Sequence, residues 1–115
     1  MLIATVVVSI ALAALLLVSG LGKLRRDPTQ MATLTTVGFP QTRAWLLATA
    51  EFAGAMGLLL GLFWWPLGVA GAAGATAYFV GATLAHIRAR DYKLAAPLTL
   101  LLLAVVALSL HSISP

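Results

Sequence analysis

Four long runs of apolar residues dominate this 115-residue sequence and limit what it can fold into. The first three runs have 21 or 22 residues, and the fourth is shorter, with 17. An α-helix needs roughly 17–25 residues to cross a hydrocarbon core of ~30 Å, so all four are long enough. The runs cover residues 2–22, 45–65, 66–87 and 94–110. Backbone polar groups find no water in lipid, so each run must be helical. We therefore predict an all-α integral membrane protein, an antiparallel four-helix bundle that forms a single domain over residues 1–115.

The composition excludes several classes of function. With 62% hydrophobic and 9% charged residues, the chain has too little polar surface to cover itself in water. It has no cysteine, which excludes a disulfide framework and thiol redox chemistry by the polypeptide itself. The net charge is +4, but the basic residues do not cluster on a soluble face that could bind nucleic acid. We therefore expect no nucleic-acid partner. No metal-ligand spacing, phosphate loop or nucleophile–base pair is present, and nothing marks the isolated chain as an enzyme.

Positive charge is confined to two of the three connections between the runs. The Lys and Arg residues are Lys23, Arg25, Arg26 and Arg43 around the first connection, and Arg88, Arg90 and Lys93 around the third. Short loops rich in Lys and Arg stay in the cytoplasm, which predicts that both termini lie outside. Trp64 and Trp65, in the second connection, are then expected as anchors at the outer interface. No Lys or Arg precedes the first run, so we interpret it as a retained span and not as a signal peptide.

The first connection carries the signals of a short helix. Asp27 is a candidate N-cap, Pro28 suits the first helical position, and Gly38 with Pro40 supplies a stop. We predict a helix over residues 28–37 that lies in the cytoplasmic interface. An irregular polar loop is the alternative.

Stripes of small residues predict where helix backbones approach each other closely. The stripes are Gly54, Gly57 and Gly61 in the second run, and Ala70, Gly74, Ala77, Gly81 and Ala85 in the third. Packing within one chain is favoured, because four short helices must first pack with each other. A second copy of the chain, and hence a homo-oligomer, stays open.

Glu51 is the residue that most clearly indicates function, because an ionisable group at membrane depth is costly. Counting from Arg43 places it roughly 12 Å into the second run. The topology brings Lys23 and His86 toward the same side, and nearby hydroxyls complete the candidate set. The candidate site residues are Glu51, Lys23, His86, Thr49, Thr83 and Ser19. They predict either a polar pocket for a lipid or quinone headgroup or a proton relay, or else a buried Glu–Lys pair that fixes helix register.

His111 is interpreted differently, because it lies at the outer end of the fourth run. We expect it to be a solvated interfacial histidine. It also lies at the opposite membrane face from His86, so one chain cannot supply both as axial ligands of one haem.

Several segments together resemble the DoxX-like family of bacterial four-helix membrane proteins, over essentially the whole chain. The segments are SGLGKLRRDP, VGFP, LLATAEFAGAMGLLLGL followed by PLG, and GATLAHIRARD. The most specific points are Lys23, Gly38, Pro40, Glu51 and His86. Their order and spacing carry the resemblance, since each single match is weak in apolar sequence.

The resemblance implies an antiparallel bundle in the bacterial cytoplasmic (inner) membrane. It also implies a membrane subunit or scaffold linked to redox or oxidative-stress assemblies, with a quinone-like or lipid ligand and with soluble or membrane redox proteins as partners. Two alternatives stay open. One is a proton-coupled small transporter, although small multidrug transporters carry their Glu in the first span and have a weaker charge bias. The other is a purely structural membrane helper.

Overall fold

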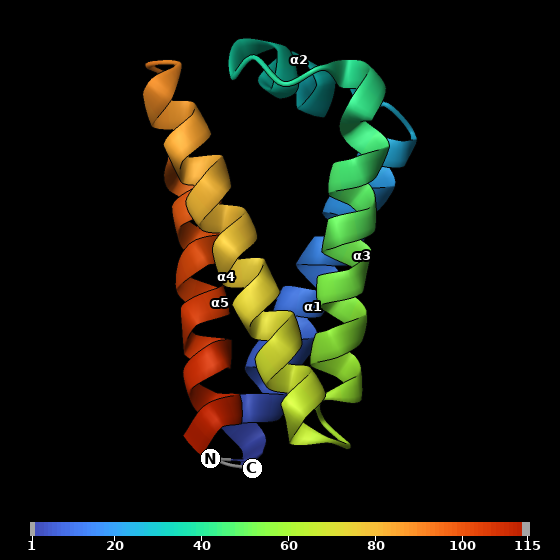
Figure 1. The fold of residues 1–115 in the computed structure, drawn as a ribbon, viewed down its shortest axis with the longest axis vertical. Helices are drawn as coiled ribbons and strands as arrows, with labels where there is room; N and C mark the ends of the chain where they lie inside the picture. Colours follow the sequence, from blue (N-terminus) through green and yellow to red (C-terminus); the bar gives the residue numbers. More distant parts are fainter. Residues whose placement is uncertain (1, 114–115) are drawn as a thin grey trace.

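The computed structural model describes residues 2–113, so the terminal residues whose placement outside was predicted are not among those described. The elements are α1 (Leu2–Leu24), α2 (Pro28–Thr36), the 3₁₀ turn η1 (Gln41–Arg43), α3 (Ala44–Leu60), α4 (Trp65–Arg88) and α5 (Ala95–Ile113). Within residues 2–113 there is no strand, and four helices are long and apolar enough to cross a membrane (Figure 1). The all-α prediction, with a short helix between the first two spans, is confirmed.

The turn between α3 and α4 begins earlier than the apolar pattern predicted. α3 ends at Leu60, and α4 begins at Trp65. The N–H of Trp64 donates to the carbonyl of Leu60 at 3.0 Å, which closes the turn. Because the turn residues include Leu62 and Phe63, hydropathy alone does not separate them from the helices on either side.

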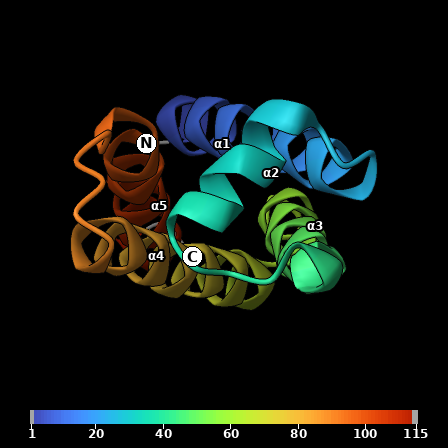
Figure 2. The same cartoon turned by 90° about the horizontal axis from the view of Figure 1, so that it is seen from above.

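The four long helices form a ring. α1 contacts α3 and α5, and α4 contacts the same two helices, so α1 and α4 lie diagonally opposite (Figure 2). α2 crosses over one end of this ring and contacts α1 (Figure 2). The α3–α4 hairpin therefore joins two helix pairs, α1 with α3 and α4 with α5.

Glycines bring α3 and α4 together near their turn. A Cβ on Gly61 would overlap the backbone of Gly68, and a Cβ on Gly57 would lie 2.9 Å from the Cα of Gly71. The small-residue stripe predicted on α3 therefore packs within the chain. Toward the α2 end the two helices diverge (Figure 1).

The prediction that the small-residue stripe on α4 packs within the chain is wrong. Its members Ala70, Gly74, Ala77 and Gly81 are exposed, and α4 instead buries a neighbouring stripe. The buried stripe is Gly68, Gly71, Ala72, Ala75, Phe79 and Thr83. Both faces of α4 consist largely of small residues, so the sequence does not indicate which one meets a neighbour.

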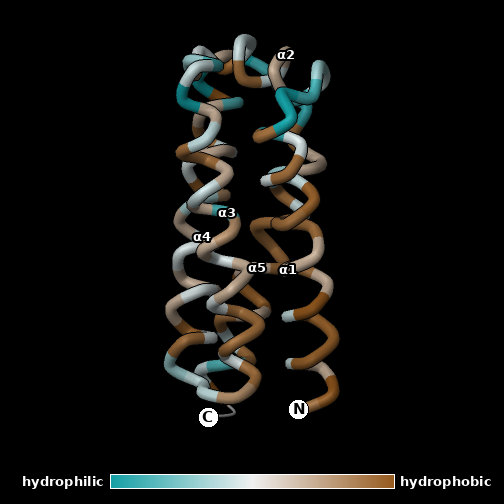
Figure 3. Tube along the Cα trace, turned by 90° about the vertical axis from the view of Figure 1, so that its right-hand side faces the viewer, coloured by the Kyte–Doolittle hydropathy of each residue, from teal (hydrophilic) through white to brown (hydrophobic). Residues whose placement is uncertain are grey.

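The core is apolar and so is much of the surface around the helix shafts. Leu12, Leu16, Leu58 and Phe79 belong to the buried cluster at the centre. Figure 3 shows hydrophobic residues along the shafts and hydrophilic residues gathered at the α2 end. An apolar outer belt of this kind is what contact with lipid chains requires.

α2 is held in place at its start, its apolar face and its end. The Asp27 carboxylate accepts from the Gln30 N–H at 3.1 Å and caps the helix. Met31 and Leu34 pack against Ala44 at the start of α3. Beyond the helix, Gly38 has φ +80°, a left-handed conformation that glycine adopts without strain. The helix predicted for residues 28–37 is confirmed and ends one residue earlier.

Candidate functional site

Glu51 is buried inside the bundle and paired with a cation from another helix. It lies on the inward face of α3 with Ala48, Ala55 and Leu58, and it is 2% exposed. The Nζ of Lys23, in the last turn of α1, lies 2.7 Å from Glu51 Oε1. The charge of each residue is thus compensated by the other, as burial requires.

Lys23 has two further partners. Its Nζ donates to Ser19 Oγ at 2.7 Å, one turn earlier in α1, and to Gln30 Oε1 at 2.9 Å, in α2. An ammonium has three donors, so these two bonds and the ion pair use all of them. Gly22 makes the α2 contact possible, because a Cβ there would overlap the Gln30 side chain.

Tyr78 connects the pair to α4. Its hydroxyl donates to Glu51 Oε1 at 3.2 Å. Glu51 Oε2, by contrast, is buried and has no hydrogen-bond partner among the residues that the structure describes. One carboxylate oxygen therefore receives both Lys23 and Tyr78, and the other retains its full accepting capacity.

Three of the predicted site residues meet, and three lie apart from them. Ser19, Lys23 and Glu51 are in contact. The other three make separate interactions: exposed Thr49 donates to the Trp45 carbonyl at 2.8 Å, His86 Nδ1 lies 2.8 Å from the Ala82 carbonyl, and Thr83 Oγ1 is buried without a partner in residues 2–113.

His86 faces the loop after α4, where its Nε2 lies 3.8 Å from Asp91 Oδ2. The bond from its other ring nitrogen to the preceding turn of α4 holds the ring in that direction. The histidine therefore belongs to the end of α4 and not to the group around Glu51.

Gln30 and Tyr78 are members of the site that the sequence reasoning missed. The contact of Tyr78 with Glu51 could have been inferred from the sequence. In an antiparallel hairpin, residues at similar distances from the turn lie at the same level, and Tyr78 and Glu51 match to within about one helical turn. The contact of Gln30 with Lys23 could not have been inferred in this way, because it depends on how α2 folds back over α1.

A second polar contact is buried at the other end of the bundle, and it corrects the expectation that His111 is solvated. His111 is 1% exposed, and its Nε2 lies 2.8 Å from Ser9 Oγ of α1. The ring occupies the space that a Cβ on Gly68 of α4 would fill. The absence of a side chain at Gly68 admits the imidazole between three helices.

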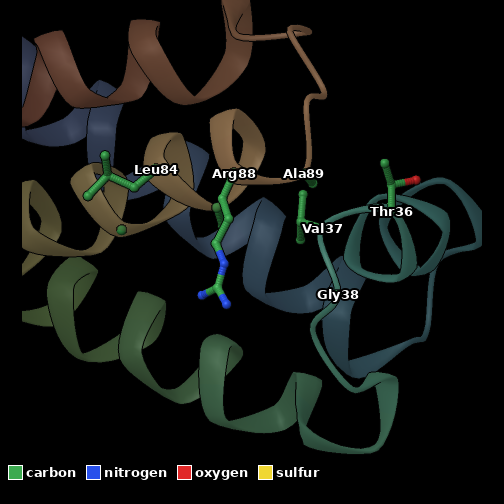
Figure 4. Close-up of a pocket in the computed structure, with 8 residues that line it drawn as sticks. Thr36, Val37, Gly38, Leu84, Arg88 and Ala89 are labelled. Carbon is green, nitrogen blue, oxygen red and sulfur yellow. The ribbon is translucent and has the colours of Figure 1, made fainter.

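A cavity of about 530 Å³ lies at the charged end of the bundle, between the end of α2 and α4 (Figure 4). Its lining includes Thr36, Val37 and Gly38 on one side and Gly81, Leu84 and Arg88 on the other. Both elements also contribute to the group around Glu51, α2 through Gln30 and α4 through Tyr78. The cavity and the buried carboxylate therefore share their supporting helices.

Four membrane-length helices, an apolar outer belt and a buried ion pair define a multi-pass membrane protein. Within residues 2–113 no group of three or more His, Cys, Asp or Glu side chains could hold a metal ion. The chain belongs to the DoxX-like family, whose model matches residues 7–109. No curated protein and no solved structure gave a match.

Proposed function

We propose that this protein binds an amphiphilic molecule, a quinone-like compound or a lipid, through the polar group around Glu51, as the membrane subunit or scaffold of a redox or oxidative-stress assembly. The observation that carries the proposal is Glu51 Oε2, which is buried and without a partner among the described residues. A carboxylate oxygen accepts hydrogen bonds, so it suits a hydroxyl on the ligand, as in a quinol or a glycerol-based lipid.

The shape of the bundle supports a ligand at this end. α3 and α4 touch at their glycines near the turn and diverge toward α2, where the cavity lies. Leu84 lines the cavity and is 59% exposed, so the cavity reaches the outer surface of the bundle. A molecule with an apolar tail could thus enter from the bilayer with its polar head toward α2.

The charge distribution supports an orientation. The Lys and Arg residues all lie at the α2 end, in or beside the connections on that side of the bundle. By the positive-inside rule, we place this end in the cytoplasm and both termini outside, in the cytoplasmic membrane of a bacterium. The proposed ligand site then faces the inner leaflet.

The experiment is retention of a defined ligand by detergent-purified protein. Wild-type protein and Glu51→Gln are incubated with a short-tailed benzoquinol kept reduced, or with phosphatidylglycerol, and are then repurified, extracted and quantified. Thr49→Val is the matched control, because Thr49 lies on the exposed face of the same helix. We expect wild type and Thr49→Val to retain one of the probes and Glu51→Gln to retain several-fold less. Equal retention by all three proteins, or none by any, contradicts the proposal; melting temperatures verify that the variants are folded.

A structural role is the second candidate, favoured by the complete set of acceptors around Lys23 Nζ. In that case the pair fixes the register of α1 against α3. No added quinone or lipid then shifts the melting temperature, whereas Lys23 and Glu51 still show strong coupling in a double-mutant cycle. A melting temperature that rises with ligand in wild type but not in Glu51→Gln favours binding.

A further inference from the structure

Arg88 is an uncompensated positive charge in the wall of the cavity. It is the charged side chain in that lining, and it makes no hydrogen bond or ion pair with any residue that the structure describes (Figure 4). The two carboxylates at this end are already engaged. Asp27 caps α2, and Asp91 accepts from the Lys93 N–H and lies near His86.

The exposed face of α4 continues from the cavity as a shallow apolar track. Gly81 lines the cavity, and Ala77 and Gly74 follow it along the same side of the helix, away from the charged end. A Cβ on Gly81 or Gly74 would meet nothing within 4 Å. Small side chains leave room for a hydrocarbon chain to lie against the helix backbone.

We infer that the cavity binds the headgroup of an anionic phospholipid, with its phosphate on Arg88 and an acyl chain along Gly81, Ala77 and Gly74. The inference rests on the proposed function and narrows its ligand to an anionic lipid. A guanidinium binds phosphate through two parallel hydrogen bonds. A zwitterionic headgroup offers the same phosphate but adds a cation that Arg88 repels, so an anionic headgroup is preferred. Basic pockets between membrane helices at the cytoplasmic side are suited to such headgroups.

Free inorganic phosphate offers the same charge to Arg88 but makes no use of the apolar track. The lipid is favoured because the cation and the track are continuous on one helix. Position also favours it, since Arg88 is the last residue of α4 and therefore lies near the level of the phosphate layer.

The test compares phosphatidylglycerol with phosphatidylcholine of identical acyl chains, bound to detergent-purified full-length protein and measured by native mass spectrometry. Wild type, Arg88→Gln and Arg88→Lys are examined, with Arg25→Gln as the matched control. Arg25 is exposed at the same end of the bundle and is not part of the cavity lining. Gly81→Leu, with Arg88 intact, tests the track separately.

We expect wild type to prefer phosphatidylglycerol, and Arg88→Gln to bind it about tenfold more weakly. Binding of phosphatidylcholine should weaken less, because its choline cation already offsets part of the attraction between its phosphate and Arg88. Arg88→Lys should recover part of the preference, Arg25→Gln should retain it, and Gly81→Leu should weaken both lipids. Melting temperatures close to wild type show that a loss does not come from unfolding.

Four results overturn the inference. Equal binding of the two lipids by wild type removes it while leaving amphiphile binding at Glu51 intact. An equal loss in Arg25→Gln and Arg88→Gln assigns the preference to general surface charge. Displacement of phosphatidylglycerol by millimolar inorganic phosphate, with no effect of Gly81→Leu, identifies a phosphate site. Binding of neither lipid nor a quinone by any variant removes the proposed function as well.

Discussion

Lys23 and Glu51 place opposite charges 2.7 Å apart inside the bundle, although α2 and its flanking loops separate them in the sequence. The pair joins the end of α1 to the middle of α3. Through Tyr78 it also reaches α4. The same contact thus ties together the two helix pairs of the bundle.

Breaking this ion pair from one side should be strongly destabilising. Lys23→Met or Glu51→Gln alone leaves a buried group without its partner, for which we expect a loss of about 3–5 kcal/mol. The double variant should lose less than the sum of the two, and the difference is the coupling energy. Reversible unfolding in mixed micelles measures all three. Lys93→Met combined with Glu51→Gln is the control pair and should be additive, because Lys93 is exposed; additivity for Lys23 would contradict a direct interaction.

Removal of the Tyr78 hydroxyl should have a smaller effect. Glu51 Oε1 keeps Lys23 in Tyr78→Phe, so the loss is that of one hydrogen bond to a charged group, about 1.5–3 kcal/mol. Tyr92→Phe is the matched change at a tyrosine that is 69% exposed, and it should be neutral. The same unfolding assay compares them, and indistinguishable stabilities would place the Tyr78 hydroxyl outside the network.

The glycines of α3 and α4 should differ sharply in their tolerance of a methyl group. Gly61→Ala pushes a Cβ into the backbone of Gly68, which cannot move aside as a flexible side chain would, so we expect the hairpin to separate and the melting temperature to fall. Gly74→Ala meets nothing within 4 Å and should be neutral, or more stable by about 0.5–1 kcal/mol because Ala favours the helix. Thermal unfolding of the two single variants tests this prediction. A similar fall in melting temperature for both would contradict the close contact at Gly61.

The buried His111 should depend on Ser9. Ser9→Ala leaves a ring nitrogen without its partner between three helices, at a cost of about 1–3 kcal/mol. Ser109→Ala removes a hydroxyl from an exposed position of α5 and is expected to change stability little. Urea or thermal unfolding distinguishes the two, and a Ser9→Ala protein as stable as Ser109→Ala would mean that the contact contributes nothing.

The proposed orientation can be read from single cysteines, because the chain has none of its own. Thr29→Cys, in α2, and Ser112→Cys, near the end of α5, are both at exposed positions at opposite ends of the bundle. A membrane-impermeant maleimide added to intact cells should label Ser112→Cys and should label Thr29→Cys only after the cells are opened. The reverse pattern would invert the orientation.

The long helices were predictable because a single physical requirement, the satisfaction of backbone polar groups in lipid, leaves the apolar runs no other structure. α2 was predictable from local capping by Asp27 and Pro28. The boundary at Leu60 was not, because its turn is as apolar as the helices that it joins. Which of the two small-residue faces of α4 is buried depends on where α3 packs against it, and no local sequence pattern predicts this.

The site was predictable to the extent that charge required it. A carboxylate at the depth of Glu51 needs a cation as its partner, and Lys23 lies at the end of the preceding span. From its position in the sequence, His86 could also supply the cation that Glu51 needs. In the structure, its ring is held by the Ala82 carbonyl and faces Asp91. His111 was misjudged because its burial depends on a missing side chain at Gly68, a residue far away in the sequence.

The concentration of charge at the α2 end gives the molecule an electrical axis. Seven Lys and Arg, less the carboxylates of Asp27, Asp91 and Glu51, the last of which is paired with Lys23, leave a net charge of +4 on that end. Moving one charge across a potential of 100 mV requires about 2.3 kcal/mol, so carrying four across would require roughly 9 kcal/mol. In the proposed orientation, the voltage of an energised membrane holds this end on the negative side and opposes inversion for as long as the cell maintains it.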